Sequence, residues 1–407
     1  MSKLALFGGD SVRKDLFPDW PRPTSELSES VLNTLKNENW GVGSDVISKF
    51  EEEFSAFHDA KYCISTSSGT TALWVALKAA GVKAGDEVII PAYTFIATAS
   101  AVLMANAVPV FVDIDGSTFN MDPELLEGVI TEKTKAIIPV HIAGNPADMD
   151  KITAIAEKYG IPIVEDAAQA HGAEWNGKKV GALGLGGIFS FQTSKNMTAG
   201  EGGAIITNDD SFKEACFSYH NCGRVSGGEW YEHQHLGGNF RLNALAASML
   251  LPQLDTIHGD MERRDQNKQL LDNGLSDIDG IELLGSYEQV TRSAHHLYVV
   301  KYKKEAFNGI HRDVFFKAMQ AEGVYTYAGY TPLYREKLFV TDPDEYPWLK
   351  DQDYPSLKLP VTEQMCDEEA VWLKQNHLLG DENDINDIVN AFEKVTDALR
   401  KTPEIFR

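Results

Sequence analysis

Residues 190–203 contain one lysine, Lys195, in a run of small and polar residues that ends in a glycine-rich turn. Short apolar runs at 188–191 and 204–207 predict a strand on each side of this segment. A lysine held in a pocket at a strand end loses its proton more easily than a surface lysine, because burial disfavours the charged ammonium. Its free amine could then attack an aldehyde and form a Schiff base. A lone lysine also suits an ordinary loop, so its role depends on the residues that accompany it.

A second candidate site lies upstream, where small hydroxyl residues separate a predicted strand from a predicted helix. Residues 62–66 form a short apolar run, Gly69 and Thr70 lie in the hydroxyl-rich segment after it, and residues 72–80 have helical character. This arrangement brings free backbone N–H groups, hydroxyls and the positive end of a helix dipole together, which suits a phosphate. Simple capping of the helix by serine or threonine is the alternative.

Strands and helices alternate through the middle of the chain with short connections. The predicted strands cover residues 87–90, 108–112, 136–140 and 161–164, and the predicted helices cover residues 96–104, 123–129 and 149–158. This order predicts a mostly parallel sheet with helices on both faces. In such sheets a ligand lies beyond the carboxyl ends of the strands. Phe95, Asp166 and Lys195 all follow predicted strand ends, so we expect them to meet at one edge of the sheet.

Together these residues match the needs of pyridoxal 5′-phosphate (PLP). Lys195 would supply the amine for its aldehyde, Asp166 would keep its pyridine nitrogen protonated, and Phe95 would cover the flat ring. The remaining candidates are polar and would bind the phosphate (Gly69, Thr70, Ser190) or the ring hydroxyl (Gln169). Each has a structural alternative, such as a turn cap for Asp166 or a core position for Phe95. We expect no metal site.

The composition excludes several function classes. The chain has 407 residues and a formal net charge of −23, which disfavours binding to nucleic acid or to an anionic bilayer. The uncharged run at 88–112 is interrupted by prolines and polar residues, so we interpret it as buried strand and helix. The cysteines are scattered without a CxxC pair, which suggests no disulfide framework and a cytoplasmic location: Cys63, Cys216, Cys222 and Cys366.

The pattern predicts two domains. Residues 1–255 would form an N-terminal arm and a large PLP-binding domain, and residues 256–407 a smaller C-terminal α/β domain. Prolines predict that the arm is irregular through residue 30, with a short helix at 31–37. A helix from 243 to about 257 would lead out of the large domain. The last helix, around residues 385–399, has the clearest helical periodicity, with Asp381 or Asn383 as its cap.

Six segments resemble the DegT/DnrJ/StrS sugar aminotransferases, which have the fold type I architecture of PLP-dependent transferases. These segments are residues 68–70, 91–95, 111–115, 165–169, 190–203 and 238–243. The resemblance implies that Lys195 carries the cofactor, Asp166 pairs with its pyridine nitrogen and Gln169 with its ring oxygen. It also implies that Ser190, Gly69 and Thr70 bind the phosphate. Asn239 matches an asparagine that reaches the phosphate from the second subunit, which implies a homodimer with shared active sites.

A few residues indicate which substrate group within the family the chain resembles. Gln192 stands where members acting on nucleotide-linked keto sugars usually have histidine. Together with residues 221–224 and residues 371–373 and 378–379, this glutamine makes the chain resemble the inosose aminotransferases of aminocyclitol antibiotic pathways and the aminohydroxybenzoate synthases. The expected reaction moves an amino group from glutamate or glutamine to a cyclic ketone. By resemblance His296 and Tyr330 would line the acceptor pocket. Either Arg241 or Arg224 could bind the donor carboxylate, because arginine can clamp it with two hydrogen bonds.

Other functions remain as alternatives. A nucleotide-linked keto-sugar aminotransferase would use the same residues, and so would a PLP-binding sensor without catalytic activity. A dehydratase on this scaffold would have histidine in place of Lys195. A nicotinamide oxidoreductase is suggested by the glycines at 181–187, but their spacing does not match GxGxxG at the start of a helix.

Overall fold

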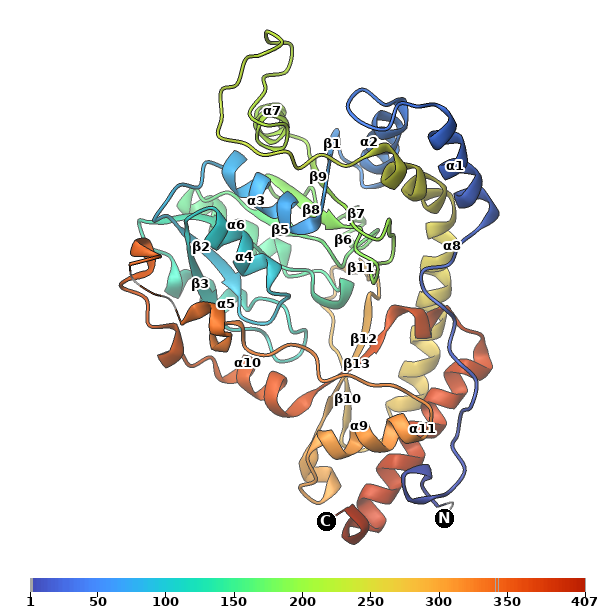
Figure 1. Cartoon of the computed structure of the whole chain (residues 1–407). Coiled ribbons are helices and arrows are strands. Elements are labelled where there is room, and N and C mark those ends of the chain that lie inside the picture. Colours follow the sequence, from blue (N-terminus) through green and yellow to red (C-terminus); the bar gives the residue numbers. More distant parts are fainter. Residues whose placement is uncertain (1–2, 341, 343, 407) are drawn as a thin grey trace.

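The computed structural model describes residues 3–340, 342 and 344–406 (Figure 1). Its centre is a four-stranded sheet in the order β1-β9-β8-β5, followed by a three-stranded sheet in the order β4-β2-β3. Parallel bridges between Ile137 and Ile163 and between Val140 and Asp166 join the two. The strands are β1 (Tyr62–Thr66), β9 (Gly203–Thr207), β8 (Gly186–Ser190), β5 (Val164–Asp166), β4 (Thr134–Ile137), β2 (Glu87–Pro91) and β3 (Val108–Val112).

The sheet is mostly parallel, as predicted. β2 runs parallel to β3 and β4, and β5 runs parallel to β8, whereas β9 is antiparallel to both β1 and β8. The antiparallel strand follows directly from the Lys195 segment, which turns the chain back from the end of β8 into β9. The lysine therefore lies in the connection at the carboxyl edge of the sheet.

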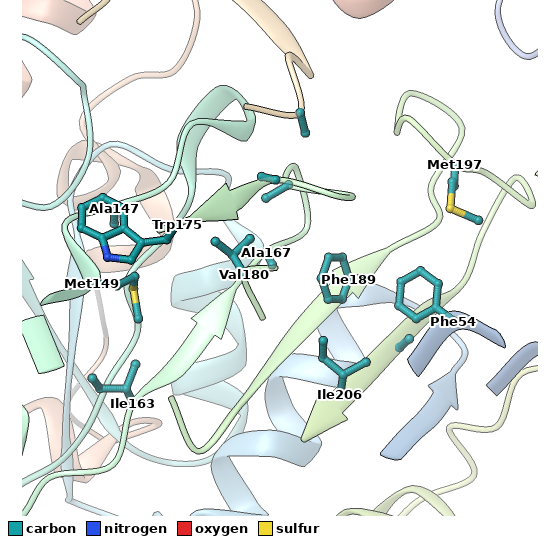
Figure 2. Packing of buried hydrophobic residues seen from close by; sticks show 14 of the residues in the cluster. Phe54, Ala147, Met149, Ile163, Ala167, Trp175, Val180, Phe189, Met197 and Ile206 are labelled. Atoms are coloured by element: carbon teal, nitrogen blue, oxygen red, sulfur yellow. The ribbon is translucent and has the colours of Figure 1, made fainter. Parts of the chain in front are cut away.

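Helices cover both faces of this sheet. They are α2 (Asp45–Phe57), α3 (Gly69–Ala79), α4 (Ala97–Met104), α5 (Pro123–Leu126), α6 (Met149–Tyr159) and α7 (Asp210–His220). Adjacent strand residues belong to two different cores: Phe189 and Ile206 pack with Phe54 of α2, whereas Ile188 and Ile205 pack with α3, α4 and α7. Figure 2 shows the first of these cores, where the rings of Phe54 and Phe189 lie 5.2 Å apart. This alternation follows from the pleat of a strand buried on both faces.

The C-terminal part forms a second α/β unit against α8 (Ala244–Leu275), and its antiparallel sheet has the order β10-β12-β13. Its other elements are β10 (Ile281–Leu283), β12 (Leu297–Tyr302), α9 (Arg312–Ala321), α10 (Pro360–Gln364), β13 (Ala370–Lys374) and α11 (Glu382–Lys401). A small sheet pairs β11 (Val290–Arg292) with β6 (Glu174–Trp175) and β7 (Lys178–Lys179). Asp381 caps α11 in a capping box with Asp384, as one of the two predicted caps.

Three helix boundaries predicted from sequence were wrong, and two strands are displaced: β4 covers 134–137 rather than 136–140, and β5 covers 164–166 rather than 161–164. The helix of the arm, α1 (Ser25–Lys36), begins well before residue 31, because the Thr24 hydroxyl caps it by accepting a 3.1 Å hydrogen bond from the Leu27 N–H. α3 begins at Gly69 rather than at residue 72. α8 continues to Leu275 rather than ending near 257, because its apolar stripe passes from the first core to the C-terminal one. The proposed domain division at residue 255 therefore falls inside a continuous helix.

Three further expectations concern membrane spans, disulfides and metal sites. Across the described residues, no helix combines the length and the apolar character that a membrane span requires. All four cysteines are free. Within the described part of the chain, no three histidine, cysteine or acidic side chains gather closely enough to hold a metal ion.

Candidate active site

A cavity of about 1020 Å³ lies at the carboxyl edge of the central sheet, where the C-terminal unit faces it. Most of the residues predicted from sequence line this one cavity: Gly69, Thr70, Phe95, Asp166, Gln169, Ser190, Lys195, His296 and Tyr330. They come from segments more than 200 positions apart in the chain, and the parallel strand ends together with the C-terminal unit bring them together.

Lys195 projects from a tightly hydrogen-bonded turn. Its N–H donates to Gln192 O at 2.9 Å, and the Thr193 N–H donates to Gly200 O at 3.0 Å across the base of the turn. Gly200 has φ +81°, a left-handed conformation that favours glycine. Burial lowers the pKa of the Lys195 ammonium to about 8, although the negative charge of Asp166 acts in the opposite direction. About a tenth of this amine is therefore unprotonated at pH 7, far more than for a surface lysine.

Asp166 occupies the end of β5, deep in the cavity wall. Its Oδ2 accepts a 2.8 Å hydrogen bond from the Thr98 hydroxyl, and its Oδ1 accepts one of 3.2 Å from the Ala168 N–H. Burial raises the pKa of Asp166, while these two hydrogen bonds and the nearby Lys195 charge lower it. The carboxylate is thus fixed in orientation and close to a cation, as a partner for a protonated ring nitrogen must be.

The segment before α3 has the form of an anion cradle. The Ser68 hydroxyl accepts a 3.1 Å hydrogen bond from the Thr71 N–H, and the first intrahelical bond runs from the Ala72 N–H to Ser68 O. The N–H groups of Gly69 and Thr70 precede these bonds and are available to a ligand. A Cβ on Gly69 would lie 2.8 Å from Ser190 Cβ, so only glycine lets the cradle close onto Ser190.

Gln169 has its amide orientation set by its neighbours. Its Oε1 accepts from the Ala143 N–H at 2.8 Å, so its Nε2 is the donor that reaches the Tyr330 hydroxyl at 3.0 Å. Tyr330 packs edge-on against Trp372, with ring centroids 4.6 Å apart. Phe95 is 54% exposed and lies at the mouth of the cavity, where its ring is free to cover a planar group.

His296 is buried beside Lys195 in the cavity wall. Its Nδ1 donates to Asn196 Oδ1 at 3.2 Å, because the amide nitrogen of Asn196 is already used in a 2.6 Å bond to Ala294 O. Burial, and then the charge of Lys195, hold the pKa of His296 well below its usual range. The imidazole is therefore neutral, with Nε2 left as an acceptor.

Three predicted residues do not line the cavity: Asn239, Arg241 and Arg224. They belong to the segment between α7 and α8, whose last part pairs with the end of β1 through a bridge between Thr66 and Arg241. Asn239 is exposed and pairs with Asn221, and Arg241 Nη1 donates to Asn221 Oδ1 at 2.9 Å.

The structure also adds cavity residues that the sequence did not suggest. The indole N–H of Trp20, in the arm, donates to Lys195 O at 3.0 Å. Gln375 and Asn376, directly after β13, line the same wall. Neither segment contains a motif that would predict a place in the cavity. The one unusual feature is a single tryptophan, Trp20, in a proline-rich arm.

Comparisons with known proteins agree with this geometry. The sequence pattern of the DegT/DnrJ/EryC1/StrS aminotransferase family matches residues 21–393. The chain belongs to this family. It is 38% identical over 413 residues to the L-glutamine:2-deoxy-scyllo-inosose aminotransferase of Micromonospora echinospora, covering 97% of this chain and 98% of the relative. The family predicted from sequence is therefore confirmed, and the protein is a PLP-dependent aminotransferase.

Solved structures of family members share the fold. The 3-amino-5-hydroxybenzoic acid synthase structure aligns with a TM-score of 0.84 at 33% identity, over 96% of this chain and 100% of the other. The NtdA protein of Bacillus subtilis, solved with bound pyridoxamine phosphate (PMP), aligns with a TM-score of 0.81 at 27% identity, over 95% of this chain and 86% of the other. The fold type I prediction is confirmed by these matches.

Proposed function

We propose that this aminotransferase moves an amino group from L-glutamine or glutamate to a cyclic ketone of the inosose type. The observation that carries the proposal is the character of the cavity wall. Its lining side chains include Trp20, Phe95, Tyr327, Tyr330 and Trp372, whereas none of the described residues that line it is an arginine. A nucleotide-linked sugar would bring a diphosphate that needs cationic partners.

The aromatic wall suits a small polyhydroxylated ring. The C–H faces of such a ring pack against aromatic side chains, and its hydroxyls bind the polar groups between them. Apart from Lys195, the cation among the described lining residues is Lys374. Lys374 is exposed at the rim of the cavity, and its ammonium lies 4.7 Å from the ring centroid of Tyr327. The M. echinospora relative is named for the use of L-glutamine and an inosose, which supports this substrate class.

Different residues of the cavity bind the cofactor and transfer the proton. We propose that Gly69, Thr70 and Ser190 hold the phosphate of PLP, and that Asp166 holds the proton of its ring nitrogen. When bound, PLP supplies an aldehyde for the amine and an electron sink for the substrate carbon. Lys195 is the general base and acid that moves a proton at the α-carbon of the amino donor, for which a pKa near 8 is suitable.

We propose a homodimer as the working unit, with a cytoplasmic location suggested by the free cysteines. The segment between α7 and α8 exposes large apolar side chains, with Trp230 83% and Leu236 92% exposed. A second copy covering this segment would bury that surface and bring Asn239 toward its cavity.

The test is a two-step assay with purified holoenzyme. L-Glutamine should bleach the visible band of the cofactor, and scyllo-inosose or 2-deoxy-scyllo-inosose should then restore it with formation of an aminocyclitol. Restoration by a nucleotide-linked 4-keto sugar alone would favour that other branch of the family. Bound cofactor that reacts with no amino donor would instead indicate a sensor.

A further inference from the structure

Arg264, on α8, is a buried cation without a carboxylate partner. Its side chain is 0% exposed. Its Nε and Nη2 both donate to the amide oxygen of Gln375, at 3.1 and 2.6 Å, and its Nη1 is buried with no hydrogen-bond partner in the described structure. Burial lowers the pKa of the guanidinium only to about 10, so it stays charged at neutral pH.

The nearest acidic residues on the same helix are engaged elsewhere. Asp260 pairs with Arg22 at 2.5 Å, and Asp265 pairs with Arg292 at 2.9 Å. Within the described ranges, no acidic oxygen lies within 4 Å of the Arg264 nitrogens. A buried charge of this kind is costly unless an anion or its equivalent approaches it.

Gln375 connects this charge to the active site. It is 2% exposed and lines the same cavity as Lys195, whereas Arg264 does not line it. A guanidinium has only donors, so the amide oxygen of Gln375 must face Arg264 and its NH₂ group must face the other way. The cavity wall therefore carries a fixed N–H donor backed by a positive charge, which Asp260 and Asp265 affect only from a distance and which lies 5.8 Å from the centroid of the Trp20 ring.

We propose that Gln375, oriented by Arg264, binds the carboxylate of the amino donor. This inference rests on the proposed function and identifies its donor subsite. The acceptor is an uncharged ketone, so the anionic carboxylate is the group that gains from the charge behind the amide. Arg241 and Arg224, the candidates from sequence, lie outside the cavity of the same chain.

The test measures ligand binding to the holoenzyme by titration calorimetry. The probe is glutaramate, which is L-glutamine without its α-amino group and so cannot react, and scyllo-inositol serves as the uncharged matched ligand. Gln375→Glu keeps the side-chain size and its bonds to Arg264 but replaces the N–H donor with a second anion oxygen. We expect it to weaken glutaramate binding by about tenfold or more and to leave scyllo-inositol binding within about twofold.

A second variant distinguishes loss of the proposed contact from misfolding of Gln375→Glu. Arg264→Met removes the charge and frees the Gln375 amide to rotate, and it should also weaken glutaramate while sparing scyllo-inositol. Retention of the visible cofactor band shows that the rest of the site is intact. Unchanged glutaramate affinity in both variants, or an equal loss for both ligands, would overturn the proposal. A wild-type enzyme that reacted with no amino donor would contradict the proposed function. The binding comparison would still show whether Gln375 binds the carboxylate.

Discussion

The Thr98 hydroxyl donates a 2.8 Å hydrogen bond to Asp166 Oδ2, and both residues are buried. Thr98 lies on α4 and Asp166 at the end of β5, so the bond crosses from a helix to the neighbouring strand end. The Thr94 hydroxyl lies 3.1 Å from that of Thr98, and because Thr98 donates to Asp166, Thr94 donates to Thr98. This chain of hydroxyls orients the carboxylate and favours its charged form against burial.

Replacing Thr98 with valine should therefore weaken catalysis. We expect Thr98→Val to lower kcat/KM by about tenfold or more, because a hydrogen bond to a charged group is worth about 1.5–3 kcal/mol. It should also raise the pKa of Asp166, so the acid limb of the pH–rate profile should move to higher pH. Thr98→Ser keeps the hydroxyl and should restore both properties. A valine variant with the wild-type pH profile would show that the hydroxyl does not act on Asp166.

The pKa of Lys195 predicts how fast the cofactor-free enzyme captures PLP. Only the neutral amine attacks the aldehyde, so the capture rate should rise about tenfold between pH 7 and pH 9 and then level off, as for a group with a pKa of about 8. Stopped-flow absorbance would measure it. Asp166→Asn removes the charge that raises the pKa of Lys195, so its profile should shift to lower pH. A rate that kept rising past pH 10 would mean that Lys195 titrates like a surface lysine.

The contact between Gly69 and Ser190 predicts a specific loss of cofactor binding. In Gly69→Ala the new Cβ would lie 2.8 Å from Ser190 Cβ, and relief of this overpacking costs about 1–3 kcal/mol by opening the cradle. We expect the Kd for PLP to rise about fivefold to a hundredfold, measured by equilibrium titration. Gly128→Ala is the matched control, because a Cβ there would meet no atom within 4 Å. Equal losses in both variants would argue against a role for close packing at the cradle.

The half of the cavity built on strand ends could be predicted from the sequence. Asp166, Ser190 and Lys195 each stand beside a strand with a clear apolar run, and a parallel sheet brings such ends to one edge. These local signals, together with the motifs around Gly69 and Lys195, are sufficient to predict the cofactor.

Apart from His296 and Tyr330, the opposite wall could not be predicted, because long-range packing places it. Trp20 reaches Lys195 from 175 positions away, and Gln375 meets Arg264 from 111 positions away. Arg264 belongs to a polar-looking stretch of α8 whose burial depends on the C-terminal unit. The residue types made Arg241 and Arg224 candidates for the donor carboxylate, whereas no sequence pattern indicates that Arg264 is buried.

Borohydride reduction followed by peptide mass spectrometry shows whether Lys195 is the residue joined to the cofactor. Reduction of the holoenzyme should fix the cofactor mass on the peptide that contains Lys195, and Lys195→Ala should lose both this label and the visible band. Lys374, which lines the same cavity, is the internal control and should stay unlabelled. A label on Lys374, or a visible band that persists in Lys195→Ala and is fixed by borohydride, would show that another residue holds the cofactor.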